Sequence, residues 1–195
     1  MPLRIGPRHL ATARHCVLPF TGRPVPRFRF GPNYYDTARL GYYYVSNIIH
    51  LPTNAQPTDP SGDNCYWKED WAVLVLEQRA GDTHGFLGAK VIDPSTQLNR
   101  AMFFNLGYPQ DPGGTRRPYR QDAISVRSAS SCEPTGPLIT DADVTPGNSG
   151  GTLWLLENGL RFQYGMCGAG SPGISLFSGG NRWLSAVNRA RSDFP

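Results

Sequence analysis

The chain has 195 residues, enough for one large domain or two small ones with a buried core. Its 22 glycines, 18 prolines, nine tyrosines and nine phenylalanines indicate a turn-rich β protein. The formal net charge of +4 comes almost entirely from scattered arginines, since Lys68 and Lys90 are the two lysines. Scattered charge favours a solvated surface over a nucleic-acid-binding face. No 18-residue apolar run is present, so no membrane span is expected.

The first 17 residues, MPLRIGPRHLATARHCV, contain no apolar run of the kind that a secretory signal peptide needs. The cysteines lack the close pairs of a zinc site, and no His-Glu-x-x-His motif occurs, so neither a metal nor a cofactor is expected. Four cysteines are compatible with two disulfides in an oxidising compartment. Of the three possible pairings we favour Cys16–Cys65 and Cys132–Cys167, one in each half of the chain.

The first half of the chain carries a histidine and an aspartate at strand ends. A short apolar run ends at His15, and residues 42–52 form an aromatic, β-branched strand pattern before a polar loop at 53–64. Asp70 then begins a continuous apolar strand at 71–76. Burying an unpaired carboxylate is costly, so Asp70 needs a partner, and His15 is the natural one.

The second half reads as a series of strands. We expect strands at 85–92, 100–106 and 125–131. Gly107-Tyr108-Pro109 forms a turn after the second of these, and a Pro- and Gly-rich loop then extends to Arg120. Further strands at 152–156 and 160–164 flank an Asn-Gly pair, which is a strong hairpin signal. Near the end of the chain, Trp183, Leu184 and Val187 fall on one helical face.

The stretch 141–156, DADVTPGNSGGTLWLL, sets Ser149 among glycines between a Pro-Gly turn and an apolar strand. Glycine allows a sharp turn and a close approach to substrate, because it has no Cβ. The backbone N–H groups of Gly147 and Ser149 are therefore candidates for an oxyanion hole, where one well-placed donor lowers the barrier by ~3 kcal/mol. Ser149 is the candidate nucleophile.

The order of partners along the chain restricts the type of hydrolase. An α/β-hydrolase needs a histidine after the serine, whereas all four histidines (9, 15, 50 and 84) precede Ser149. The subtilisin order leaves Asp36 with His50 or His84 formally open, but no helix-forming segment carries the serine. The order His15, Asp70, Ser149 fits the chymotrypsin arrangement.

Four blocks resemble the chymotrypsin-like serine proteases, closest to the Deg/HtrA and glutamyl endopeptidase branches: TARHC at 12–16, DWAVLVL at 70–76, GYP at 107–109 and ITDADVTPGNSGG at 139–151. The resemblance implies an all-β fold of two six-stranded barrels, 1–95 and 96–195, with the active site between them and a short carboxy-terminal helix. Since 14 residues precede His15, the first barrel is expected to lack its amino-terminal strands.

The same resemblance implies a secreted or periplasmic serine endopeptidase that acts on polypeptides through an acyl-enzyme. His15 would be the general base, Asp70 its partner and Ser149 the nucleophile, with Gly147 and Ser149 as oxyanion donors. Gly165, on the strand after the nucleophile, would lie beside the bound peptide. Cys167 stands where glutamyl endopeptidases carry the pocket histidine, so the resemblance assigns no cleavage specificity.

Two alternatives remain open at this stage. One is a catalytically inactive homologue that acts as a binding module, whose mark would be a broken triad; none is broken here. The other is an esterase that uses the same triad on small esters, and the small residues from Gly165 to Gly170 favour a peptide groove over such a pocket.

Overall fold

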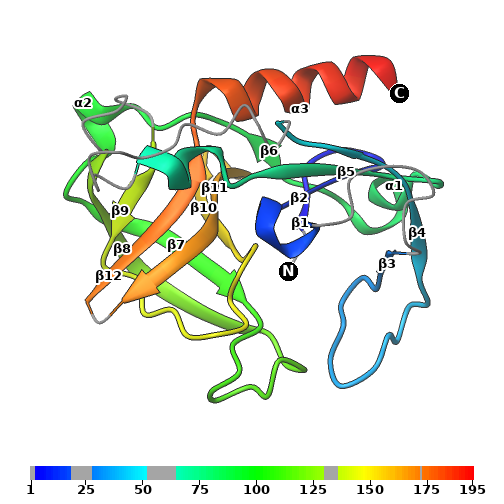
Figure 1. Cartoon of the computed structure of the whole chain (residues 1–195), viewed down its shortest axis with the longest axis horizontal. Coiled ribbons are helices and arrows are strands. Elements are labelled where there is room, and N and C mark those ends of the chain that lie inside the picture. The colour runs from blue at the N-terminus through cyan, green and yellow to red at the C-terminus, as the bar shows by residue number, and fades with distance from the viewer. Residues whose placement is uncertain (1–2, 19–27, 52–64, 130–135, 172) are drawn as a thin grey trace.

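The computed structural model describes residues 3–18, 28–51, 65–129, 136–171 and 173–195. Each half of the chain forms its own β-sheet, and a carboxy-terminal helix, α3 (Asn181–Asp193), packs against strands of both (Figure 1). The expected all-β, two-part architecture with a terminal helix is therefore confirmed. Within the described segments, no helix is long and apolar enough to cross a membrane.

The first sheet is open and has five strands in the order β1-β2-β5-β4-β3. Its strands are β1 (Leu3–Arg4), β2 (His9–Thr12), β3 (Arg29–Phe30), β4 (Tyr43–Ile49) and β5 (Ala72–Leu76). The central strand is β5, because its five residues are all aliphatic and all buried, as a strand covered on both faces requires. The two edge strands, β1 and β3, do not pair with each other, so this half is an incomplete barrel, as expected.

The second sheet closes into a six-stranded barrel. Its strands are β7 (Ala101–Gly107), β8 (Tyr119–Ala129), β9 (Leu138–Thr140), β10 (Thr152–Glu157), β11 (Leu160–Ser171) and β12 (Ile174–Gly179). They run in the order β10-β7-β8-β9-β12-β11, and pairing of β10 with β11 closes the ring. The expected hairpin joins these two strands through Asn158 and Gly159, both at positive φ (50° and 79°), which a two-residue turn of this kind demands.

Some expected elements have different bounds. The region 85–92 contains a two-residue strand, β6 (Gly88–Ala89), which pairs in parallel with β11. The preceding residues form a short helix, α1 (Ala80–His84), and another, α2 (Pro94–Gln97), begins after Asp93, whose side chain accepts from the Ser95 N–H. Strand β8 begins at Tyr119, inside the expected loop. The loop expected at 53–64 lies outside the described residues.

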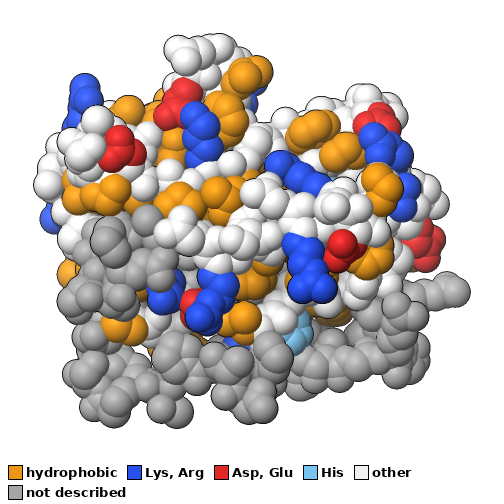
Figure 2. Space-filling view, turned by 90° about the horizontal axis from the view of Figure 1, so that it is seen from above, with side chains coloured by type: hydrophobic (Ala, Val, Ile, Leu, Met, Phe, Trp, Pro, Cys, Tyr) orange, Lys and Arg blue, Asp and Glu red, His pale blue; other side chains and the backbone are white. Residues whose placement is uncertain are grey.

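Helix α3 connects the two halves through its apolar face. Trp183 and Val187 are fully buried in a core cluster with Trp71 of the first half and Met166 of β11. Figure 2 views the molecule from the side of α3 and shows Lys and Arg side chains spread among neutral and hydrophobic ones, several of them beside acidic side chains. The described part of this face therefore carries no continuous basic surface.

The expected disulfide pairings are wrong. Cys16 and Cys167 are both free thiols, the first exposed and the second buried, so neither Cys16–Cys65 nor Cys132–Cys167 forms. Cys65 is disulfide-bonded, but not to another described residue. Cys132 lies outside the described residues. Burial raises the pKa of the Cys167 thiol to about 12, so this group stays protonated at neutral pH.

Candidate active site

Pairing of β2 with β5 brings His15 and Asp70 together. The two strands are antiparallel neighbours with Thr12 opposite Ala72, so the end of β2 lies beside the start of β5. His15 sits in a 3-10 turn (Arg14–Cys16) that follows β2, and Asp70 lies two residues before β5. One strand pairing therefore brings two residues that are 55 positions apart in the sequence into contact.

The Asp70 carboxylate holds His15 at two points. The ring Nδ1 hydrogen-bonds to Oδ2 at 2.7 Å, and the His15 backbone N–H donates to Oδ1 at 2.9 Å. The Asp70 side chain is 2 % exposed, whereas that of His15 is 39 % exposed. The hydrogen bond to Asp70, aided by one to Cys16, raises the pKa of His15 to about 10. This geometry fixes the ring so that Nδ1 faces the carboxylate, the orientation a general base of this type needs.

Contacts from the second barrel reach the same aspartate. Ser178 of β12 donates its hydroxyl to the Asp70 backbone carbonyl at 2.8 Å, a contact between residues 108 positions apart. At Gly168 of β11, a Cβ atom would lie 3.1 Å from Asp70 Oδ2, so only a residue as small as glycine fits there without displacement. The acid is thus buried where the two halves meet.

The loop that carries Ser149 is bonded to β11. Gly150 donates its N–H to the Cys167 carbonyl at 2.8 Å, and Cys167 donates to the Gly151 carbonyl at 2.7 Å. Gly150 and Gly151 are thus hydrogen-bonded to Cys167, and the next residue of β11, Gly168, is the one that packs against the Asp70 carboxylate. The structure thus brings His15 and Asp70 into direct contact, and it hydrogen-bonds the two glycines that follow half-buried Ser149 to β11.

Gly147 occupies a position that no other residue fits. Its φ of 93° lies in the region that favours glycine, and a Cβ there would lie 2.8 Å from both Thr115 Cγ2 and the Tyr108 carbonyl. Gly147 is exposed, and within the described chain its N–H donates to no backbone carbonyl. Gly147 is thus an exposed glycine two residues before Ser149.

Gly165 lies deeper than expected for a residue beside a bound peptide. It is buried within β11, where it pairs with Leu153 of β10 and Gly179 of β12. Pairing with β10 ends at Met166, whereas β12 continues to pair as far as Ser171. Beyond Met166, β11 therefore pairs with β12 alone among the described strands.

The remaining histidines and Asp36 have other partners. Asp36 lies against two arginines, with Arg117 Nε 3.0 Å from Oδ2. His84 hydrogen-bonds to the Tyr43 hydroxyl at 3.0 Å, and His50 to the adjacent backbone carbonyl of Leu51. Neither histidine contacts Asp36, so the structure does not assemble the alternative set.

Two neighbours of the site escaped the sequence analysis. The sequence does not indicate a role for Ser178, because its hydrogen bond to Asp70 depends on how β12 packs against the first half of the chain. Arg14 is fully buried, and its three guanidinium nitrogens hydrogen-bond to no atom in the segments that the structure describes. Its position next to His15 in the sequence gave no hint that the side chain points inward. No group of residues suited to a metal ion occurs in the described segments.

The sequence matches no protein-family model and no curated protein sequence. Three solved structures are similar over nearly the whole chain. A Glu endopeptidase in complex with MPD has a TM-score of 0.72 at 21% identity, covering 98% of this chain and 84% of its own. A thermostable serine protease, AL20, from an extremophilic microorganism has a TM-score of 0.69 at 19% identity, with 97% and 87% covered. Protease Anisep from Arthrobacter nicotinovorans has a TM-score of 0.67 at 19% identity, with 97% and 85% covered. The chain therefore has the chymotrypsin-like serine protease fold.

Proposed function

We propose that the chain is a serine endopeptidase with His15, Asp70 and Ser149 as its triad. The observation that carries this proposal is the His15–Asp70 pair at 2.7 Å, whose acid is buried where the two halves of the chain meet. Ser149 attacks the scissile carbonyl while His15 takes its proton, and Asp70 stabilises the imidazolium. The hydrogen bond between a nucleophile and its base is often long without substrate and shortens when substrate binds. The orientation of His15 by Asp70 is therefore the feature of the ligand-free site on which the proposal depends.

The developing oxyanion is stabilised by the backbone N–H groups of Gly147 and Ser149. Before the scissile bond, the substrate backbone pairs as an extended strand with residues 168–171 of β11, the edge that β10 leaves open. A water molecule then hydrolyses the acyl-enzyme, with His15 again as base. This use of a strand edge favours polypeptides over small esters.

The test is cleavage of an unstructured polypeptide, with products identified by mass spectrometry. The wild-type chain should produce defined fragments, Ser149→Ala should produce none, and Ser185→Ala, which changes an exposed serine on α3, should match the wild type. Hydrolysis confined to small esters would point to the esterase reading. A folded wild-type chain that cleaves neither substrate class would leave the inactive binding module as the better reading.

A further inference from the structure

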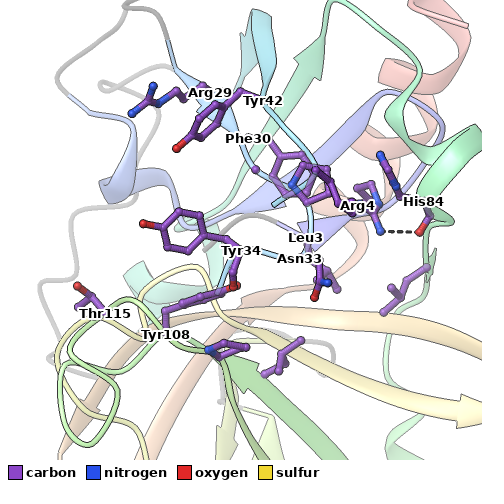
Figure 3. A pocket seen from close by; sticks show the side chains of 17 residues that line it. Leu3, Arg4, Arg29, Phe30, Asn33, Tyr34, Tyr42, His84, Tyr108 and Thr115 are labelled. Atoms are coloured by element: carbon purple, nitrogen blue, oxygen red, sulfur yellow. Dashed lines mark hydrogen bonds between the residues drawn. The ribbon is translucent and has the colours of Figure 1, made fainter. Parts of the chain in front are cut away.

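A loop of the first half of the chain meets a loop of the second half beside Gly147. The first loop, 31–42, joins β3 to β4, and the second, 108–118, joins β7 to β8. The Tyr108 hydroxyl donates to the Tyr34 carbonyl, and the two rings lie 6.2 Å apart (Figure 3). Both tyrosines and Gly147 line a cavity of about 840 Å³ that reaches β3 at the edge of the first sheet. The two loops therefore touch close to the segment that carries the candidate nucleophile.

Asp36 connects the two loops through both its side chain and its backbone. Arg117 Nε lies 3.0 Å from the carboxylate Oδ2, and Arg116 Nε lies 4.0 Å from Oδ1. The Asp36 N–H donates to the Arg116 carbonyl at 2.9 Å, and the Arg116 guanidinium donates to the Asp36 carbonyl at 2.9 Å. Asp36 has a φ of 60°, a conformation that Asp and Asn adopt more readily than most other residues. We call this set of contacts the Asp36 latch.

Asp36 supplies the negative charge on an otherwise cationic surface. Arg39 and Arg117 both lie against the Tyr35 ring, with their guanidinium carbons 5.3 and 5.2 Å from its centre. No other carboxylate among the described residues forms an ion pair with Arg39, Arg116 or Arg117. Without Asp36, the guanidinium groups of the two loops would repel one another. The carboxylate therefore favours the state in which the loops stay together.

The 108–118 loop packs against the backbone of the nucleophile segment. The Gln110 N–H donates to the Pro146 carbonyl at 2.7 Å. Thr115 lies so close to Gly147 that a Cβ added there would be 2.8 Å from Thr115 Cγ2. Arg116, the next residue along the loop, belongs to the Asp36 latch. A shift of this loop would therefore change the surroundings of Gly147.

We propose that Asp36 is a positioning residue, whose latch to the 108–118 loop holds Gly147 where its N–H reaches the developing oxyanion. The inference rests on the proposed function. Asp36 acts through the loop and takes no part in proton transfer. A donor that is already in place needs no rearrangement in the transition state, so holding Gly147 raises the rate of attack by Ser149.

The test compares fluorophosphonate labelling of Ser149 in the wild type and in Asp36→Asn. Asparagine keeps both backbone hydrogen bonds and tolerates the positive φ, so the substitution removes only the charge. The Asp36 and Arg117 side chains are 34% and 53% exposed, so the ion pair is a partly exposed one. At low ionic strength the maximal labelling rate should fall about two- to five-fold, whereas the probe concentration that gives half of this rate should not change.

Salt and a matched variant serve as controls. In about 1 M salt, where the Debye length is about 3 Å, the wild type should approach the rate of Asp36→Asn. Asp122→Asn breaks an exposed Asp–Arg pair within β8 and should label like the wild type. A wild-type rate that salt and Asp36→Asn both leave unchanged would overturn the inference.

Two double variants identify the path of the effect. Asp36→Asn combined with Arg117→Gln should slow labelling no more than either change alone, because both break the same ion pair. In a Gly147→Ala background, Asp36→Asn should cause no further loss, because the donor is already displaced. Losses that multiply with that of Gly147→Ala would show that Asp36 does not act through Gly147 and would refute the assignment.

Hydrogen exchange tests the latch without any catalysis. Peptides that cover 109–117 and 145–148 should exchange faster in Asp36→Asn than in the wild type, and those from α3 should not change. Unchanged exchange in 145–148 would contradict the positioning role. Labelling of Ser149 that ignores Asp36 would remove this inference and leave the proposed function intact, whereas a folded wild type that never labels would refute the proposed function.

Discussion

Replacement of Asp70 by asparagine isolates the cause of the raised pKa of His15. The largest contribution to the pKa of about 10 is the hydrogen bond to Asp70. At pH 7, three units below that value, about one molecule in a thousand carries the neutral imidazole that a general base requires. The rate of attack by Ser149 should therefore rise about tenfold per pH unit from pH 7 towards pH 10 in the wild type.

Asp70→Asn removes the charge while keeping the shape of the side chain. The pKa of His15 should fall towards the ordinary 6.5, and the plateau rate should drop by up to about 10⁴-fold, because the imidazolium loses its stabilising carboxylate and the ring its fixed tautomer. The assay is the rate of labelling by a fluorophosphonate between pH 6 and pH 10.5, which needs no knowledge of the substrate. A wild-type midpoint near 6.5 that Asp70→Asn leaves unmoved would refute the reasoning.

The remaining predictions concern four sites. Iodoacetamide should alkylate Cys16, which is exposed, and should not alkylate Cys167, which is 3% exposed and has a thiol pKa raised to about 12. Peptide mass mapping measures the two modifications, and equal modification would contradict the burial of Cys167. Arg14→Met should raise the free energy of unfolding by about 1–4 kcal/mol in urea, because it replaces a buried charge that lacks a described partner; a loss of stability would count against this. Gly147→Ala should slow fluorophosphonate labelling by about 10²–10³-fold, whereas Gly159→Ala, with open space around its Cβ in the β10–β11 hairpin, should label like the wild type. Stability should also depend on pH. The pKa of His15 is higher in the folded than in the unfolded chain, so the pair stabilises fully below about pH 6.5 and its contribution is lost as the pH rises through about 10; urea titrations should show this decline in the wild type and not in Asp70→Asn.

The pairing of His15 with Asp70 could be predicted because both residues stand at the ends of strongly patterned strands. The apolar run before His15 forms β2, and the apolar run after Asp70 forms β5. The register between these two strands places His15 and Asp70 in contact. The hairpin at Asn158 and Gly159 was equally readable, since two adjacent residues at positive φ need this pair of amino acids.

The features that could not be predicted depend on the packing of distant segments. Cysteine spacing does not reveal that Cys167 is buried in the second barrel while Cys16 is exposed, so the pairings favoured from the sequence are wrong. The region 85–92 has the composition of a strand, but only two of its residues find a partner, on β11. The cavity combines an edge of the first sheet with a loop of the second barrel, and no local pattern encodes that meeting.

The central claim is that His15 activates Ser149 as the nucleophile. Its most direct test is mass-spectrometric mapping of the residue modified by a fluorophosphonate on the wild type, His15→Ala and Ser149→Ala. The account predicts a single adduct on Ser149 in the wild type, strongly slowed in His15→Ala and absent from Ser149→Ala. An adduct on another residue, or one that forms on Ser149 equally fast without His15, would contradict it.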